Sequence, residues 1–141
     1  MASVSLLVAD TSAWHRSDHP EVARRWRQEL LADRVAATPP MRLEILYSAR
    51  SATDLRAIAL ELDGLRQIPC PQSAFARAEE VQRCLGERAG LHHRSVKLVD
   101  LLIAAAAEQG EAIVWHYDED YERIAAITGQ PTEWIATRGS L

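Results

Sequence analysis

The feature that most constrains the fold is an alternation of short apolar segments with longer segments of helical periodicity. The apolar segments are short, as buried parallel strands are, and they predict strands at residues 4–9, 35–38 and 112–115. Residues 66–68, which Pro69 follows, and residues 132–135, as a final edge strand, are expected to complete the set. The intervening segments predict helices at residues 20–32, 39–49, 53–62, 73–87, 95–109 and 119–128. Strands that alternate with helices form a parallel sheet covered on both faces, so we expect an α/β fold.

Cap residues set the expected ends of several helices. Thr11 or Ser12 is expected to cap a helix that follows the first strand, and Ser95 to cap the helix that ends near residue 109. Gly110 and Gly129 stand where two helices are expected to end.

Length and composition are those of an ordinary globular chain. The 141 residues suffice for one hydrophobic core, and we expect residues 1–141 to form a single domain. With 48% apolar and 26% charged residues, the chain is neither disordered nor fibrous. We expect no signal peptide and no membrane span, and Cys70 and Cys84 lack metal-ligand spacing. Both thiols are therefore expected to be reduced and semi-buried, in a cytoplasmic protein, with a disulfide between them as the alternative.

The net charge of -4 limits how the protein can bind nucleic acid. A protein that only neutralises phosphates is usually basic. Either nucleic acid is not the partner, or a bound cation supplies part of the positive charge.

Three acidic residues follow two of the predicted strands. Asp10 comes directly after the strand at 4–9, and Asp118 and Asp120 come shortly after the strand at 112–115. Ligands of open parallel sheets bind beyond the carboxyl ends of the strands, so these carboxylates are expected to face a binding crevice. The alternatives are that Asp10 caps a turn or helix and that Asp120 complements a helix dipole.

Two further acids lie on apolar helix faces. Asp100 falls within an apolar stripe at helical spacing, and Glu44 lies in a helix that is apolar on most of its surface. The stripe consists of Val96, Val99, Ile103, Ala104 and Ala107. A buried carboxylate is costly unless it is paired or bound to a metal. A buried salt bridge is therefore the alternative to a metal site for each acid.

Carboxylates gathered at one end of a sheet repel one another, and a bound divalent cation is the simplest way to offset this repulsion. A site made of oxygen ligands suits Mg²⁺ or Mn²⁺. His92 and His93 are adjacent, so they would point apart, and we expect them in a loop and not in a zinc site.

Four segments resemble the acidic blocks of PIN-domain proteins, and most of all those of the VapC toxins of type II toxin–antitoxin systems. The segments are LLVADTSAW at 6–14, RLEIL around Glu44, VDLLIAAAA at 99–107 and VWHYDEDYERIA at 114–125. They occur in the family's order across nearly the whole chain. The last block contains the D-x-D-aromatic pattern at 118–121.

The resemblance implies a three-layer α/β/α fold around a parallel sheet of four or five strands. It also implies an endoribonuclease in which water, activated by Mg²⁺ or Mn²⁺, cleaves RNA phosphodiester bonds. By position, Asp10, Glu44, Asp100 and Asp118 match the family's catalytic, metal-binding acids. Asp120 matches a further acid that often assists at the metal.

The family further implies a homodimer and a cognate VapB-type antitoxin that inhibits the enzyme, with no membrane partner. Candidate RNA contacts are Thr11, Ser12, Arg94 and Lys97, and the basic cluster Arg24, Arg25 and Arg27. For the basic residues, a solvated surface or an antitoxin contact is an equal alternative. Trp14 is a candidate for stacking on a base, with a core or dimer-interface role as the alternative.

Two positions depart from the family pattern. Trp115 and His116 stand where a Thr or Ser is common, so a supporting hydroxyl is not supplied there. Tyr121 stands where Phe is commoner. Neither departure removes a proposed metal ligand.

Two other functions compete with the nuclease. A haloacid-dehalogenase-like phosphatase needs a second Asp two residues after the first, and Ser12 occupies that place. A catalytically inactive PIN-like binding module would keep the fold without turnover, and the complete set of acids argues against it.

Overall fold

A computed structural model describes residues 4–88 and 92–141. Within them the chain forms five strands: β1 (Leu7–Ala9), β2 (Val35–Ala37), β3 (Arg66–Gln67), β4 (Ile113–His116) and β5 (Thr132–Trp134). The strand order is β3-β2-β1-β4-β5, and every neighbouring pair is parallel. The expected parallel α/β sheet is confirmed, with the larger of the two expected strand numbers.

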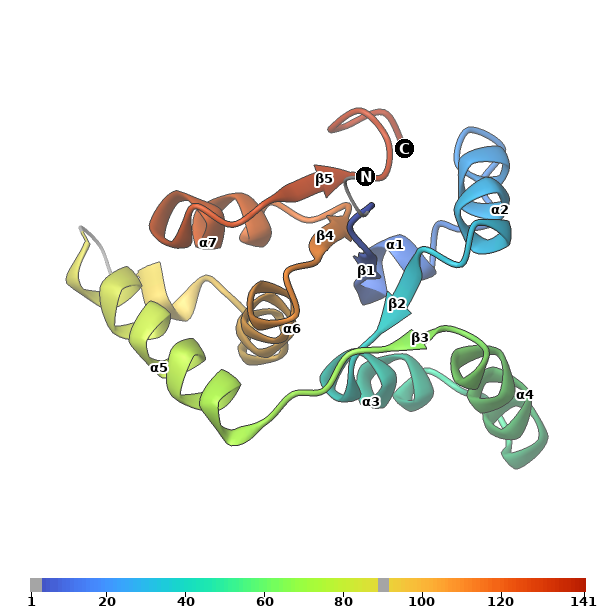
Figure 1. The fold of residues 1–141 in the computed structure, drawn as a ribbon, viewed down its shortest axis with the longest axis horizontal. Coiled ribbons are helices and arrows are strands. Elements are labelled where there is room, and N and C mark those ends of the chain that lie inside the picture. Colours follow the sequence, from blue (N-terminus) through green and yellow to red (C-terminus); the bar gives the residue numbers. More distant parts are fainter. Residues whose placement is uncertain (1–3, 89–91) are drawn as a thin grey trace.

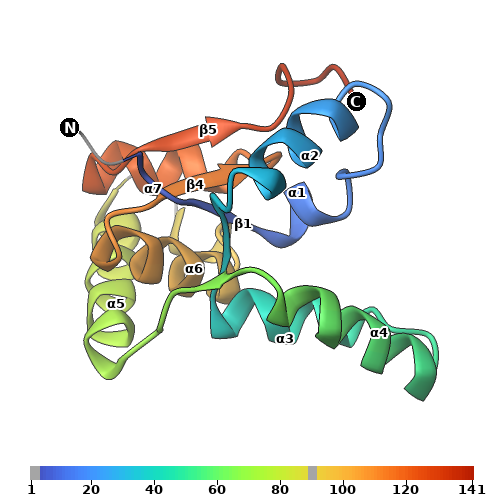
Figure 2. The same ribbon diagram turned by 45° about the vertical axis from the view of Figure 1, so that its right-hand side comes forward.

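Helices cover both faces of this sheet (Figures 1 and 2). They are α1 (Thr11–Trp14), α2 (Ala23–Leu31), α3 (Pro39–Tyr47), α4 (Ala52–Asp63), α5 (Gln72–Glu87), α6 (Leu98–Gln109) and α7 (Asp120–Thr128). In Figure 1, α2 and α4 lie on one side of the strands and α5, α6 and α7 on the other, as right-handed crossovers require. None of the described helices is long and apolar enough to cross a membrane.

The central strands β1, β2 and β4 are largely buried, as is typical of parallel strands covered by helices on both faces. Leu7 and Val8 of β1 and Val114 and Trp115 of β4 are fully buried. The ring of Trp115 stacks on Trp26 of α2, with ring centroids 5.4 Å apart. This contact fixes α2 against the centre of the sheet.

β1 lies where the chain reverses its direction across the sheet. From β1 the chain moves to β2 and β3 on one side, and it then returns to β4 and β5 on the other. The backbone N–H of Asp10 donates to the carbonyl oxygen of Trp115 at 3.1 Å, so the carboxyl ends of β1 and β4 are adjacent. Such a switch point is where open α/β sheets bind ligands.

Two local predictions were wrong. α6 begins at Leu98 and not at Ser95, because the chain is still extended at Lys97 (φ -66°, ψ 144°). Asp10, and neither Thr11 nor Ser12, caps α1, since its carboxylate accepts the N–H of the third helical residue.

One further boundary differs in detail. α2 begins at Ala23, three residues later than predicted, after hydrogen-bonded turns. The connection between α5 and α6, where His92 and His93 were expected, contains a short 3-10 helix, η1 (His92–Arg94). Gly129, with φ 72°, ends α7 as predicted.

Candidate active site

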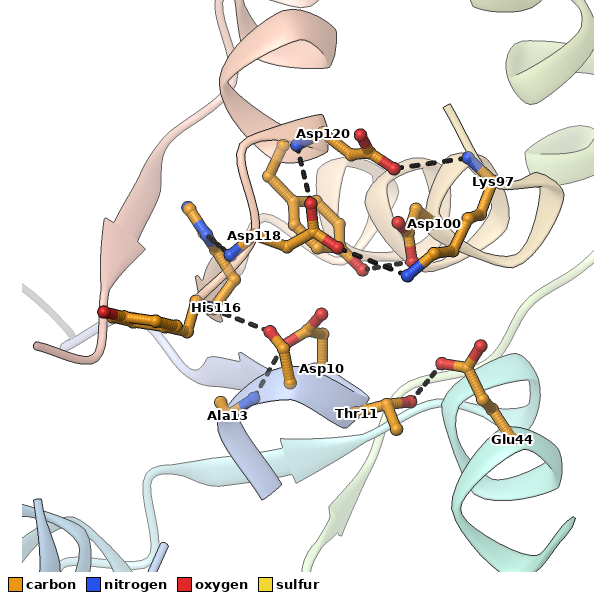
Figure 3. Close-up of polar contacts among 12 residues, drawn as sticks. Asp10, Thr11, Ala13, Glu44, Lys97, Asp100, His116, Asp118 and Asp120 are labelled. Atoms are coloured by element: carbon orange, nitrogen blue, oxygen red, sulfur yellow. Dashed lines mark hydrogen bonds and ion pairs between the residues drawn. The ribbon is translucent and has the colours of Figure 1, made fainter. Parts of the chain in front are cut away.

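The four predicted metal-binding acids meet in one pocket at the switch point (Figure 3). Asp10 follows β1, Glu44 lies on α3, Asp100 lies on α6 and Asp118 follows β4. The pocket has a volume of about 340 Å³ and is lined by Asp10, Thr11, Ser12, His15, Glu44, Tyr47, Ser48, Lys97, Asp100 and Asp118. Four separate segments of the chain therefore supply carboxylates to one place.

Asp10 caps α1 and lines the pocket at the same time. Its Oδ1 accepts the backbone N–H of Ala13 at 3.0 Å and the hydroxyl of Ser12 at 2.6 Å. The Ser12 hydroxyl oxygen accepts the backbone N–H of Tyr117 at 2.8 Å, which ties α1 to the end of β4. The capping alternative is confirmed, and it does not conflict with a role in the site, because the capping interactions use Oδ1 and not Oδ2.

Asp100 is the most deeply placed acid of α6. Only 2% of the residue is exposed. Its Oδ1 accepts the phenol hydroxyl of Tyr121 at 3.1 Å, whereas its buried Oδ2 has no hydrogen-bond partner among the described residues. A buried carboxylate oxygen without a partner is costly, and a cation would relieve that cost.

Asp100, Asp118 and Asp120 form a cluster in which one carboxylate oxygen of each lies within 4.8 Å of the others. Asp118 Oδ1 accepts the backbone N–H of Asp120 at 2.9 Å, which shapes the turn into α7. Lys97 bridges the cluster, because its Nζ lies 3.5 Å from Asp118 Oδ2 and its backbone N–H donates to Asp120 Oδ2 at 3.3 Å. Asp120 also forms an ion pair with Arg123 at 3.0 Å. Because it stands in the first turn of α7, the alternative that it complements the helix dipole applies as well.

Glu44 approaches the pocket from the other side (Figure 3). The hydroxyl of Thr11 donates to Glu44 Oε1, so α1 orients this carboxylate. The apolar surface of α3 is only partly buried, at Met41 and Ile45 among others. Leu43 and Tyr47 are 72% and 92% exposed.

Burial makes the two deepest acids hard to ionise. It raises the pKa of Asp10 to about 6, although hydrogen bonds from neighbouring groups favour the charged form. Burial, together with the neighbouring carboxyl groups of Asp120, Asp10 and Asp118, raises the pKa of Asp100 to about 8. A bound cation would reverse this effect by favouring both carboxylates over the acids.

His116 supports the loop that carries Asp118. The imidazole is fully buried, packs against the rings of Tyr121 and Trp134, and has its pKa lowered by that burial. Its Nδ1 accepts the backbone N–H of Asp118 at 3.1 Å, which places the proton of the neutral ring on Nε2. An imidazole thus holds the loop at the position where the resemblance implied a hydroxyl.

The predicted RNA contacts divide into two groups. Thr11, Ser12 and Lys97 line the pocket, whereas Arg94 is exposed on η1 outside the described lining. Trp14 packs edge-on against a neighbouring indole, with ring centroids 6.0 Å apart, which favours its packing role.

Three residues of the pocket were missed by the sequence analysis. They are His15, Tyr47 and Ser48. Spacing was the available signal, because His15 comes four residues after Thr11, and the other two come three and four residues after Glu44. Residues three or four apart share one side of a helix.

The arrangement fits a hard divalent cation. The cluster of Asp100, Asp118 and Asp120 offers carboxylate oxygens, the ligands that Mg²⁺ and Mn²⁺ prefer. The buried Oδ2 of Asp100, which has no hydrogen-bond partner among the described residues, offers a further ligand atom to such a cation. We therefore regard the pocket as a candidate metal centre.

Sequence comparisons place the chain among known proteins. The PIN domain family matches residues 7–127. The chain is 64% identical over 132 residues to "Ribonuclease VapC18" of Mycobacterium tuberculosis, an alignment that covers 94% of this chain and 96% of the relative. It is 40% identical over 132 residues to "Ribonuclease VapC21" of the same species, covering 93% of this chain and 94% of the relative.

Solved structures share the fold. The structure described as "DNA bound VapBC from Salmonella typhimurium" contains a chain with a TM-score of 0.70 at 17% identity, covering 94% of this chain and 100% of that chain. A chain of VapBC2 from Rickettsia felis gives a TM-score of 0.71 at 18% identity, covering 92% and 98%. Fold, sequence and the order of the acidic blocks agree: the chain belongs to the PIN domain family, in its branch of VapC ribonucleases.

Proposed function

We propose that this protein is a metal-dependent endoribonuclease toxin that cleaves RNA phosphodiester bonds with Mg²⁺ or Mn²⁺ and is inhibited by a cognate VapB-type antitoxin. The observation that carries the proposal is the convergence of Asp10, Glu44, Asp100 and Asp118 in one pocket. The names of the VapC relatives support the ribonuclease activity.

Asp10, Glu44, Asp100 and Asp118 would hold the cation, with Asp120 assisting from the first turn of α7. When bound, the cation supplies an activated water for in-line attack on the phosphodiester and stabilises the charge of the leaving oxygen. It also counters the negative field that would otherwise repel the RNA backbone.

The chain's own residues orient these groups. Ser12 and the backbone N–H of Ala13 fix Oδ1 of Asp10, and Thr11 fixes Glu44. Lys97, two-thirds exposed beside Asp118, would bind an RNA phosphate at the mouth of the pocket. Arg94 would contact RNA further from the reacting bond.

The acidic pocket also explains how an antitoxin would inhibit the enzyme. An arginine inserted among these carboxylates would pair with them strongly and take the place of the cation. Solved structures that share the fold include a toxin–antitoxin complex from Klebsiella pneumoniae and a member of the VapBC family of toxin–antitoxin systems, which supports such a partner. We further propose a homodimer that acts in the cytoplasm, with residues 1–141 as one domain.

Cleavage of RNA by the purified protein tests the proposal. The protein should cut RNA internally in Mg²⁺ or Mn²⁺ and stop when EDTA is added. Asp10→Asn and Asp100→Asn should each lose at least about 100-fold in activity, because even groups that only orient metal ligands contribute about 10–100-fold. Asp63→Asn is the matched control, since Asp63 is exposed on α4 and pairs with Arg42.

Two outcomes would contradict the nuclease. Absence of any metal-dependent cleavage would favour the catalytically inactive binding module. Release of inorganic phosphate from small phosphomonoesters, with internal RNA bonds left intact, would favour a phosphatase.

A further inference from the structure

Tyr121 is a buried tyrosine whose hydroxyl contacts an acid of the pocket. It stands in the first turn of α7, is fully buried, and packs its ring against His116 at 5.0 Å between centroids. A phenylalanine would fill the same space, so packing alone does not require the hydroxyl. Burying a hydroxyl is costly unless it is hydrogen-bonded, and the partner it has found is an acid of the pocket.

That partner is Asp100. The Tyr121 hydroxyl donates to Asp100 Oδ1 at 3.1 Å, while Asp100 Oδ2 is buried with no hydrogen-bond partner in the part of the chain that the structure describes. The tyrosine therefore holds one oxygen of the carboxyl group. The other oxygen is left for a ligand.

We propose that Tyr121 is a positioning residue for metal binding: its hydroxyl fixes the Asp100 carboxyl group so that Oδ2 is available to the cation. This inference rests on the proposed function, since it presumes that the pocket takes a divalent ion. Partners that orient a metal ligand by hydrogen bonding contribute about 10–100-fold to metal affinity. Tyr121 does not touch RNA in this proposal.

Isothermal titration with Mn²⁺ on the full chain tests the inference. Tyr121→Phe keeps the ring and removes only the hydroxyl, and we expect its dissociation constant for Mn²⁺ to rise by about 10–100-fold. Tyr117→Phe is the matched control, because the Tyr117 hydroxyl bonds to the backbone of Leu141. Its affinity for Mn²⁺ should stay within about twofold of the wild type. Circular dichroism melts confirm that both variants are folded.

RNA cleavage at rising Mn²⁺ concentration gives an independent readout. If Tyr121 acts through the metal, saturating Mn²⁺ should restore the activity of Tyr121→Phe, whereas a damaged fold would not be rescued. Unchanged Mn²⁺ affinity in Tyr121→Phe would overturn the inference and leave the nuclease proposal standing. A wild-type protein that binds no Mn²⁺ at all would overturn both.

Discussion

Replacing Asp10 with Asn is expected to stabilise the metal-free protein at alkaline pH while removing its response to metal. Asp10 is 2% exposed, and burial raises the pKa of its carboxyl group from 3.8 to about 6. Each pH unit of that difference corresponds to about 1.4 kcal/mol, so ionising Asp10 costs the fold about 3 kcal/mol. Asn cannot ionise, and its side-chain oxygen can still accept the N–H of Ala13 and cap α1.

The sign of the pH dependence follows from the raised pKa. Between pH 3.8 and about pH 6 the folded protein binds more protons at Asp10 than the unfolded chain does. The wild type therefore loses stability as the pH rises through this window, and the loss is complete above it. Asp10→Asn should match the wild type near pH 4 and exceed it by up to about 3 kcal/mol at pH 8.

Thermal melts at pH 4.5 and pH 8, with and without Mn²⁺, measure both effects. For a chain of this size, about 3 kcal/mol corresponds to an increase in Tm of roughly 10 °C at pH 8. Mn²⁺ should raise the Tm of the wild type, because it binds the folded state, and should leave Asp10→Asn unchanged. A metal-free Asp10→Asn protein that melts below the wild type at pH 8 would refute the assignment of Asp10 as a strained, buried acid.

Three further substitutions test the surroundings of the site. Ser12→Ala removes a donor to Asp10 and an acceptor for the N–H of Tyr117, so urea unfolding should show a loss of about 1–3 kcal/mol. Gly129→Ala should lower the free energy of unfolding by about 1–2 kcal/mol in the same assay, because φ is 72°. No atom lies within 4 Å of the added Cβ, so the cost comes from the backbone alone, and a negligible loss would contradict this reasoning. Lys97→Gln, in an inactive Asp10→Asn background, should weaken RNA binding and reduce the slope of log K against log salt by about 1; an unchanged slope would remove Lys97 from the RNA contacts.

Local sequence signals predicted the elements well where periodicity was strong. The parallel sheet followed from short apolar segments between helices, and the end of α7 at Gly129 followed from a residue that tolerates positive φ. The start of α6 was missed by three residues, because tertiary contacts decided it: the N–H of Lys97 donates to Asp120, 23 residues away. The local preference of serine for helix caps, on which the prediction at Ser95 rested, contains no information on such a distant hydrogen bond.

The sequence by itself determined which acids were candidates, since Asp10 and Asp118 follow apolar strands and Asp100 interrupts an apolar stripe. Only the tertiary structure decided how these acids are held. The adjacency of β1 and β4, the bond from Thr11 to Glu44 and the bond from Tyr121 to Asp100 join residues up to more than a hundred positions apart. Periodicity indicates which face of its own helix or strand a residue occupies. The hydrogen-bond partner of an acid across the pocket depends instead on how the helices and strands pack, which is a property of the whole chain.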